Sequence, residues 1–262
     1  MAEIWKHQSF TPPLTTTGKA ALLPTPPWYY SAWALNVGFS YDATRASTFV
    51  PEGLGRVTGN GCVHFVYWQA TATSDDLLDP TMSQFRETSF MLEVEQPDGE
   101  IYNYCPAMWV NQDASLVRGI LQGLPKKTGN TWLTQSFPIA HPAASPLAAG
   151  TKIGGVLSAR DRVVFEAQAV LTGEKSEALG YTARPTIGAI GMPDMRNPGS
   201  LPVPRFTRAD TRDFVYSEWH EADAALTVHP HPYEEVDSLG ELAVTRSNVG
   251  YFGFTLHGVI DV

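Results

Sequence analysis

The chain has 262 residues, of which 43% are hydrophobic and 17% charged, with a net charge of −9 and a pI near 5.2. Nucleic acid and anionic membrane surfaces are excluded as partners, because both require clustered Lys and Arg and only 18 such residues are present. Two cysteines and the lack of an apolar run of transmembrane length predict a reduced, soluble, cytoplasmic protein.

Short strands joined by turns dominate the predicted elements, since 20 Pro and 22 Gly are spread along a chain that rarely holds a helical period. Residues 1–27 are rich in Pro and Thr and predict an irregular N-terminal arm. Asp42 is the expected N-cap of the first short helix. In the first half of the chain we expect strands at 28–41, 61–70, 84–95 and 100–110, short helices at 42–49 and 113–121, a polar loop at 71–83 and a turn at 97–100.

In the second half, alternating apolar residues again predict strands, and a segment with four prolines, 192–208, is expected to be mostly irregular. The expected strands are 132–139, 151–157, 162–171, 179–191, a hairpin of 215–220 and 224–229, and 251–259. No repeat of 20 to 50 residues is visible. The prediction is a mainly β (α+β) single domain over 28–262, barrel-like or double-sheeted, with short peripheral helices.

Two adjacent lysines, Lys126 and Lys127, follow a Gly and a Pro. An ammonium group is costly to desolvate, and a second cation beside it raises that cost, so both effects favour a neutral amine. A neutral amine attacks a ketone or aldehyde to give a Schiff base. The alternative is a solvated turn without chemistry, which the dipeptide alone favours because charged pairs near Gly and Pro are usually exposed.

Four segments in order resemble the acetoacetate decarboxylase superfamily. They are Val50-Pro51-Glu52-Gly53-Leu54, Phe85-Arg86-Glu87, the aromatic segment 102–110 followed by Gly123-Leu124-Pro125-Lys126-Lys127, and the His-Pro tail 229–236. Glu87 lies 39 residues before Lys126, a spacing that resembles the family's own. The resemblance extends from about Pro24 to the end of the chain and implies the family's β-barrel or double-sheet fold.

By this resemblance, Lys126 forms the imine, Lys127 makes Lys126 easier to deprotonate, and Glu87 is the general acid and base. Gln122, four residues before Lys126, is expected to bind a substrate carbonyl or hydroxyl; a surface position is the alternative. Glu87 has the alternative of a solvent-facing strand residue. The further expected substrate-binding residues, each of which has the alternative of a simple structural role, are Arg118, Tyr102, Tyr104, Trp109, Trp28 and Tyr251.

The chain also departs from the family pattern. No arginine stands in Ser31-Ala32-Trp33, where the resemblance places a carboxylate-binding arginine, and the strand 63–68 lacks the family's second acid. Arg118 is shifted by one residue from the family's arginine before the lysines. We therefore expect a cofactor-free lyase that decarboxylates a keto acid, or that catalyses aldol condensation and dehydration of a larger, more hydrophobic keto compound in secondary metabolism.

Other classes of function remain open from the sequence. His220, His229 and His231 show no convincing metal-ligand arrangement, and the resemblance implies neither a metal nor another cofactor. The expected partners are a small-molecule keto substrate and further copies of the chain in a homo-oligomer. A non-catalytic β-barrel that binds a small apolar ligand is the main alternative. A purely structural subunit is a third interpretation.

Overall fold

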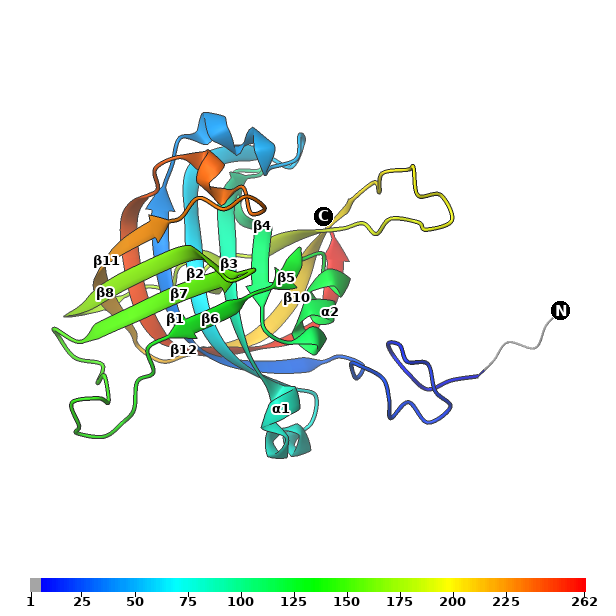
Figure 1. The fold of residues 1–262 in the computed structure, drawn as a ribbon, viewed down its shortest axis with the longest axis horizontal. Coiled ribbons are helices and arrows are strands. Elements are labelled where there is room, and N and C mark those ends of the chain that lie inside the picture. Colours follow the sequence, from blue (N-terminus) through cyan, green and yellow to red (C-terminus); the bar gives the residue numbers. More distant parts are fainter. Residues whose placement is uncertain (1–5) are drawn as a thin grey trace.

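The computed structural model describes residues 6–262, which form one 12-stranded mixed sheet with a few short helices around it (Figure 1). The strands are β1 (Trp28–Ser40), β2 (Arg56–Thr71), β3 (Gln84–Glu95), β4 (Ile101–Val110), β5 (Lys126–Thr128), β6 (Asn130–Leu133), β7 (Lys152–Ala159), β8 (Arg162–Ser176), β9 (Thr186–Ile190), β10 (Arg205–Tyr216), β11 (Trp219–Val228) and β12 (Ala243–Asp261). The helices are η1 (Ala43–Thr48), η2 (Ser74–Leu78), α1 (Pro80–Ser83), α2 (Asp113–Leu121), η3 (Gly180–Thr182) and η4 (Val236–Leu239).

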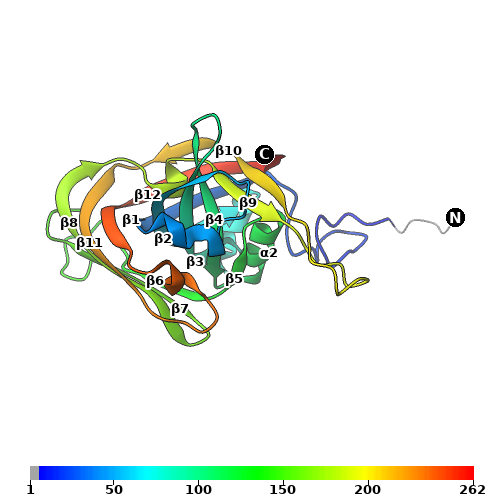
Figure 2. The same cartoon turned by 90° about the horizontal axis from the view of Figure 1, so that it is seen from above.

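Strand β1 pairs with both β2 and β12, and these pairings connect β1, β2, β3, β4, β9, β10 and β12 into a closed ring. Beyond β12 the sheet continues through β11, β8, β7 and β6, which lie over the outside of the ring (Figure 2). The large apolar core lies between these two layers. The mainly β, barrel-like or double-sheet prediction is confirmed, with a single continuous sheet supplying both layers.

Alternation along β1 shows how the sequence fills both faces of the ring. Trp33, Leu35 and Val37 enter the core between the layers, whereas Ala32 and Ala34 belong to a second apolar cluster inside the ring. Successive side chains of a strand point to opposite faces, so a strand buried on both faces is apolar throughout. This explains the continuous aromatic and apolar character of the first strand.

Helix α2 connects β4 to β5, which pair in parallel. Asp113 lies in its first turn, where a carboxylate interacts favourably with the helix dipole. The helix ends before Gly123, whose φ of +81° suits glycine. The Gly123 carbonyl accepts a 2.7 Å hydrogen bond from the backbone N–H of Ala189 in β9. The short turn into β5 is therefore held by its own helix and by a neighbouring strand of the ring.

The predicted strand at 84–95 and helix at 113–121 are confirmed to the residue, and Asp42 caps η1. Several other boundaries were wrong. Strands β2 and β12 are longer than expected, and β10 begins inside the segment expected to be irregular, because backbone pairing holds polar residues that side-chain patterns do not report. The expected hairpin of 215–220 and 224–229 is wrong, since β10 ends at Tyr216 and β11 extends without a break from Trp219 to Val228. Residues 134–139 are not a strand, and 179–191 holds only η3 and β9.

Two segments without helix or strand project from the same side of the molecule (Figure 1). One is the N-terminal arm, irregular over 6–27 as expected; its first five residues lie outside the described part of the chain. The other is the loop 191–204 before β10. Within 6–262 no helix is both long and apolar enough to cross a membrane.

Candidate functional site

A cavity of about 90 Å³ lies inside the ring, and we call it the ring cavity. Every strand of the ring contributes to its wall. The lining residues are Tyr30, Trp68, Phe85, Glu87, Met91, Met108, Gln122, Leu124, Lys126, Tyr181, Arg184, Pro185, Thr186, Ala209, Thr211, Phe214, Phe254 and Leu256. The wall is mostly apolar and aromatic, with a few polar groups that converge from several strands, which is typical of a small-molecule site.

Lys126 and Glu87 form a buried ion pair at the wall of the ring cavity. Lys126 Nζ lies 2.7 Å from Glu87 Oε2, and each side chain is only 6% exposed. The Ser115 hydroxyl accepts a second hydrogen bond from Lys126 Nζ, at 3.0 Å. Glu87 Oε1 accepts a hydrogen bond from Trp68 Nε1 at 3.1 Å. Both charges are therefore compensated by named partners, as buried charges require.

One face of α2 supports the lysine. Ser115, Gly119 and Gln122 follow one another at the helical spacing i, i+4, i+7, which places them on the same face. Ser115 binds Lys126 Nζ, and Gln122 lines the ring cavity. At Gly119 the Lys126 stem lies so close that an added Cβ would be only 2.3 Å from Lys126 Cδ. Glycine is thus needed at this position for the lysine to lie across the helix.

Lys127 lies on the opposite face of the sheet. Its ammonium group pairs with the buried Glu234 and lies 5.1 Å from the Trp109 ring centre, whereas the Lys126 ammonium lies over Phe85. Trp109 Nε1 donates a 3.1 Å hydrogen bond to the same Glu234 carboxylate. Strand alternation separates the two lysines, and an acid compensates the charge of the second. The role that the resemblance gave Lys127 therefore stays a prediction without a direct contact in its support.

The other expected substrate-binding residues fall into two groups. Gln122 lines the ring cavity beside Lys126 and Glu87, as expected. Five aromatic residues do not line it: Tyr102 and Tyr104 pack with the large core, Trp109 is buried there, Trp28 packs against Leu23, and Tyr251 lies outside the ring against Trp33. In β4 an irregularity between Tyr104 and Ala107 reverses the alternation, which single-sequence reading cannot detect.

Arg118 also lies outside the set that lines the ring cavity, although it is one helical turn from Ser115. It is 5% exposed, and its guanidinium lies 5.3 Å from the Trp28 ring centre. Within residues 6–262 its Nε and Nη1 atoms have no hydrogen-bond partner. Its charge acts on the cavity residue Tyr30, whose pKa rises to about 12 mainly through burial. Arg118 is therefore a buried cation with two N–H donor atoms that no residue within 6–262 accepts from.

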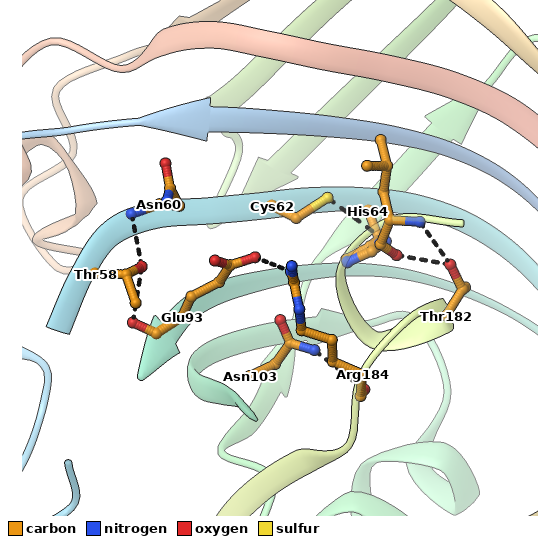
Figure 3. Close-up of polar contacts among 9 residues, drawn as sticks. Thr58, Asn60, Cys62, His64, Glu93, Asn103, Thr182 and Arg184 are labelled. Carbon is orange, nitrogen blue, oxygen red and sulfur yellow. Dashed lines mark hydrogen bonds and ion pairs between the residues drawn. The ribbon is translucent and has the colours of Figure 1, made fainter. Parts of the chain in front are cut away.

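Arg184, which the sequence did not single out, is the guanidinium that does line the ring cavity. It forms an ion pair with Glu93 of β3, and its carbonyl accepts a 3.2 Å hydrogen bond from Asn103 Nδ2 of β4 (Figure 3). The backbone N–H of Asn103 donates to the Pro185 carbonyl at 2.8 Å. These contacts connect the segment between η3 and β9 to β4 and to β3, the strand that carries Glu87.

A row of residues paired across the sheet extends to Lys126. The register pairs Asn248 with Asn36, Asn36 with His64, His64 with Ser89, Ser89 with Met108, and Met108 with Lys126. Directly paired residues lie on the same face, so the row lies along the inside of the ring. His64 Nδ1 lies 2.7 Å from Asn36 Oδ1, and Asn36 Nδ2 donates to Asn248 Oδ1 at 2.8 Å. A polar ladder therefore stabilises the inner wall beside the ring cavity.

Ser115, Trp68, Tyr181 and Arg184 were missed from the sequence. Only Ser115 left a signal, because it precedes Gly119 by one helical turn just before the lysines. The residues described include no group of three or more His, Cys, Asp or Glu that could hold a metal ion.

A family model and several solved structures match this chain. The family model described as acetoacetate decarboxylase (ADC) matches residues 11–260. The enduracididine biosynthesis enzyme MppR, complexed with the condensation product of pyruvate and imidazole 4-carboxaldehyde, is 27% identical with a TM-score of 0.90, over 98% of this chain and 97% of that chain. The same enzyme complexed with pyruvate gives a TM-score of 0.89 at 27% identity, over 98% of each chain.

An acetoacetate decarboxylase-like enzyme from Sphingomonas wittichii RW1 shares the fold at 21% identity, with a TM-score of 0.86 over 97% of this chain and 99% of that one. A comparison with curated protein sequences gave no match.

Proposed function

Because the chain belongs to the acetoacetate decarboxylase family, we propose that it is a lyase in which Lys126 forms a Schiff base with a small keto acid. The observation that carries this proposal is the position of Lys126 Nζ, buried at the wall of the ring cavity between Glu87 and Ser115. A lysine held in this way has no structural need to face an internal space. Covalent attack on a carbonyl explains its placement there.

Glu87 completes the proton balance of imine formation. It takes a proton from the Lys126 ammonium group, which leaves a neutral amine to attack the substrate carbonyl carbon. As the C–N bond forms, the C=O electron pair moves to oxygen, and a proton passes from the attached nitrogen to that oxygen to give a hydroxyl. The Glu87 carboxylic acid then returns its proton to this hydroxyl, which leaves as water while the nitrogen lone pair forms the protonated imine. The Trp68 N–H and the Ser115 hydroxyl hold the two groups in reach of each other throughout. This is general acid and base catalysis by one correctly placed carboxyl group.

The protonated imine withdraws electrons from the neighbouring carbon atoms. Glu87, again a carboxylate, can remove a proton from the adjacent carbon to give an enamine. The enamine then attacks an aldehyde carbon to form a carbon–carbon bond, and loss of water from the adduct gives an unsaturated product. We propose this aldol condensation and dehydration as the reaction, and MppR, seen with the condensation product of pyruvate and an aldehyde, supports it.

The size of the ring cavity favours a short keto acid as the first substrate. Its volume of about 90 Å³ and its mostly apolar wall suit a keto acid with a short side chain. We propose that Arg118 binds the substrate carboxylate, because its buried Nε and Nη1 have no partner among residues 6–262. Arg184 is less suited because Glu93 already compensates its charge. A carboxylate would accept hydrogen bonds from these two donors.

Borohydride trapping tests the proposal. Pyruvate, 2-ketobutyrate and acetoacetate are each incubated with the protein and reduced, and the adduct is located by intact mass and peptide mapping. We expect a reduced adduct on Lys126 and none on Lys127. The adduct mass distinguishes a retained carboxylate from one lost as CO2. Absence of any adduct with a ligand that binds by calorimetry would favour a non-catalytic binding protein instead.

A matched pair of variants controls the trapping. Lys126→Met removes the amine while keeping an unbranched side chain across Gly119, so it should abolish the adduct. Lys152→Met removes an exposed lysine of β7 and should leave the adduct unchanged. If both variants trapped equally, the modification would be nonspecific and the assignment of Lys126 would fail.

A further inference from the structure

We propose that Tyr181 is a catalytic residue, and that its hydroxyl donates the proton to the aldehyde oxygen as the new carbon–carbon bond forms. This assignment rests on the proposed function, which it deepens by naming a second proton donor at the same site. The side chain lines the ring cavity together with Lys126 and Glu87, but it comes from η3, a segment far from both in the sequence.

The hydroxyl of Tyr181 is in an unusual position. It is buried, and no hydrogen-bond partner for it exists within residues 6–262. A buried hydroxyl without a partner costs free energy, so such groups are rare unless a ligand satisfies them. The other tyrosine of the ring cavity, Tyr30, interacts through its hydroxyl with the Gln122 side chain. Tyr181 thus presents the free phenol to a ligand in this cavity.

The phenol is also held in the protonated form. Burial, and next the charge of Glu87, raise the pKa of Tyr181 well above its ordinary value. The hydroxyl therefore keeps its proton at neutral pH and acts as a donor. An alkoxide is a stronger base than a phenolate, so an aldehyde oxygen that gains the electron pair of its C=O bond can take this proton. A carbonyl oxygen before the reaction receives only a hydrogen bond.

The ring of Tyr181 is fixed by the polar row on the inner wall. Its centre lies 4.0 Å from the centre of the His64 imidazole, with 40° between the ring planes. Trp68 and Phe252 lie around it at 6.3 and 5.9 Å. Burial lowers the pKa of His64 to about 3, so the imidazole is neutral and packs against Tyr181 as an aromatic surface.

Gly180 brings the tyrosine onto that surface. It has a φ of +55°, and a Cβ at this position would lie only 2.2 Å from His64 Nε2. The backbone therefore passes directly over the imidazole edge, which only glycine permits. The Thr182 hydroxyl then donates a 2.6 Å hydrogen bond to the Leu179 carbonyl, and the Thr182 carbonyl accepts one from the Tyr216 hydroxyl at 2.9 Å. Both sides of Tyr181 are thus anchored.

The proposed step balances without another reactant. Glu87 has taken a proton from the carbon next to the imine, and the resulting enamine attacks the aldehyde carbon. The C–C bond forms, the C=O electron pair moves to oxygen, and Tyr181 transfers its proton there to leave a hydroxyl group. The phenolate then regains a proton from the Glu87 carboxylic acid. Glu87 is close enough that, as a carboxylate, it raises the pKa of Tyr181. The net result moves one proton from the substrate carbon to the product oxygen.

The test separates imine formation from bond formation. Tyr181→Phe is compared with Tyr41→Phe, which removes another buried hydroxyl without a partner, but from the core outside the ring. With pyruvate, Tyr181→Phe should keep borohydride trapping at Lys126 and exchange of the methyl protons with deuterated water. With pyruvate and imidazole 4-carboxaldehyde or benzaldehyde, its rate of condensation should fall roughly 100- to 10,000-fold. Tyr41→Phe should retain condensation.

Several results would overturn the assignment. Condensation at the wild-type rate by Tyr181→Phe would do so, as would a wild-type protein that forms the imine but condenses none of the aldehydes. If no imine forms in the wild type, the proposed function itself fails. Should Tyr181→Phe not fold, fluorotyrosines placed at position 181 replace it. The condensation rate should then vary with the acidity of the phenol, and an unchanged rate would contradict proton donation.

Discussion

Lys126 and Lys127 are consecutive in β5, yet their ammonium groups lie on opposite faces of the sheet and pair with different acids, Glu87 and Glu234. Lys126 faces the ring cavity, whereas the Lys127 side chain is 43% exposed on the other face, where it covers the buried Glu234 that Trp109 also binds. Their adjacency in the sequence therefore produces no pairing in space. We propose that Glu87 and Ser115, which contact Lys126 directly, prepare it for reaction in place of Lys127.

Replacing Lys127 by Met should leave imine formation intact but reduce stability. The change leaves the buried Glu234 carboxylate without its cation, at a cost of about 1–3 kcal/mol in the free energy of unfolding. Denaturant unfolding gives the loss, and borohydride trapping with pyruvate gives the imine. The double variant Lys127→Met with Glu234→Gln should recover part of the stability. Loss of trapping in a folded Lys127→Met protein would show that the second lysine does activate the first.

Gly119→Ala should inactivate the site while leaving the protein folded. Alanine favours a helix over glycine by roughly 1 kcal/mol, but its Cβ would lie within 2.6 Å of three carbon atoms of Lys126. The flexible lysine stem has to move away, which takes Nζ from Glu87 and Ser115. Trapping with pyruvate should decrease sharply without a lower melting temperature. Gly199→Ala, with nothing within 4 Å of the added Cβ, is the control and should keep full trapping.

Glu87→Gln should slow the removal of a proton from the substrate. The amide oxygen can still accept from Trp68 Nε1, so the side chain should remain in place, but it cannot take a proton from substrate carbon. Exchange of the pyruvate methyl protons with deuterated water, followed by NMR, should slow roughly 100- to 10,000-fold. Exchange at the wild-type rate would mean that another base acts there. Glu93→Gln, in the same strand but paired with Arg184, should not change the exchange step.

Arg118→Met should weaken recognition of the substrate carboxylate. Loss of a charge-assisted hydrogen bond predicts a KM for pyruvate about 10- to 100-fold higher. A neutral ketone of similar size, such as acetone, lacks the carboxylate, so its trapping at Lys126 should change little. Equal losses for both ligands would indicate a structural role for Arg118. The parallel variant Arg184→Met measures whether the guanidinium that lines the ring cavity contributes instead.

His64 should make the protein sensitive to acid. Burial lowers its pKa to about 3 in the folded state, whereas an unfolded histidine titrates near 6.5, so below that pH the unfolded chain binds more protons. The contribution of His64 is complete above about pH 6.5 and decreases as the pH falls toward 3. Unfolding at several pH values should therefore show a smaller loss of stability in this window for His64→Phe than for the wild type. Parallel curves would contradict a neutral buried imidazole.

Elements marked by local sequence signals were predicted well. The strand Gln84–Glu95 and the helix Asp113–Leu121 were predicted to the residue, because turn residues and apolar spacing mark their ends. Glu87 and Lys126 were singled out through the resemblance to the family and Gln122 by its position four residues before Lys126, and the structure brings all three to one cavity. Glu87 lies on β3, Gln122 directly after α2 and Lys126 on β5, so β4 and α2 lie between them in the chain.

The features that could not be predicted depend on contacts between residues far apart in the chain. The ring closes through β1 and β12, which lie at opposite ends of the domain, and no local pattern reports that contact. Tyr181 reaches the ring cavity from η3, in a segment that was expected to be a strand, and His64, against which its ring packs, is more than a hundred residues away in the chain. The prediction that aromatic residues of β4 line the cavity was wrong for a related reason, because an irregularity in the strand reverses the alternation of its faces.

The three residues of β5 determine which lysine faces the ring cavity. The parallel pairing of Lys126 with Met108 and of Lys127 with Trp109 gives each lysine its face. A shift of one residue would exchange the two faces completely, because side chains alternate along a strand. A deletion of one residue between Gly123 and Lys126 would thus place Lys127 at the position that Lys126 now occupies, on the face of the cavity. The length of this turn therefore determines which lysine reaches the cavity. Changing it would affect the site as directly as replacing Lys126.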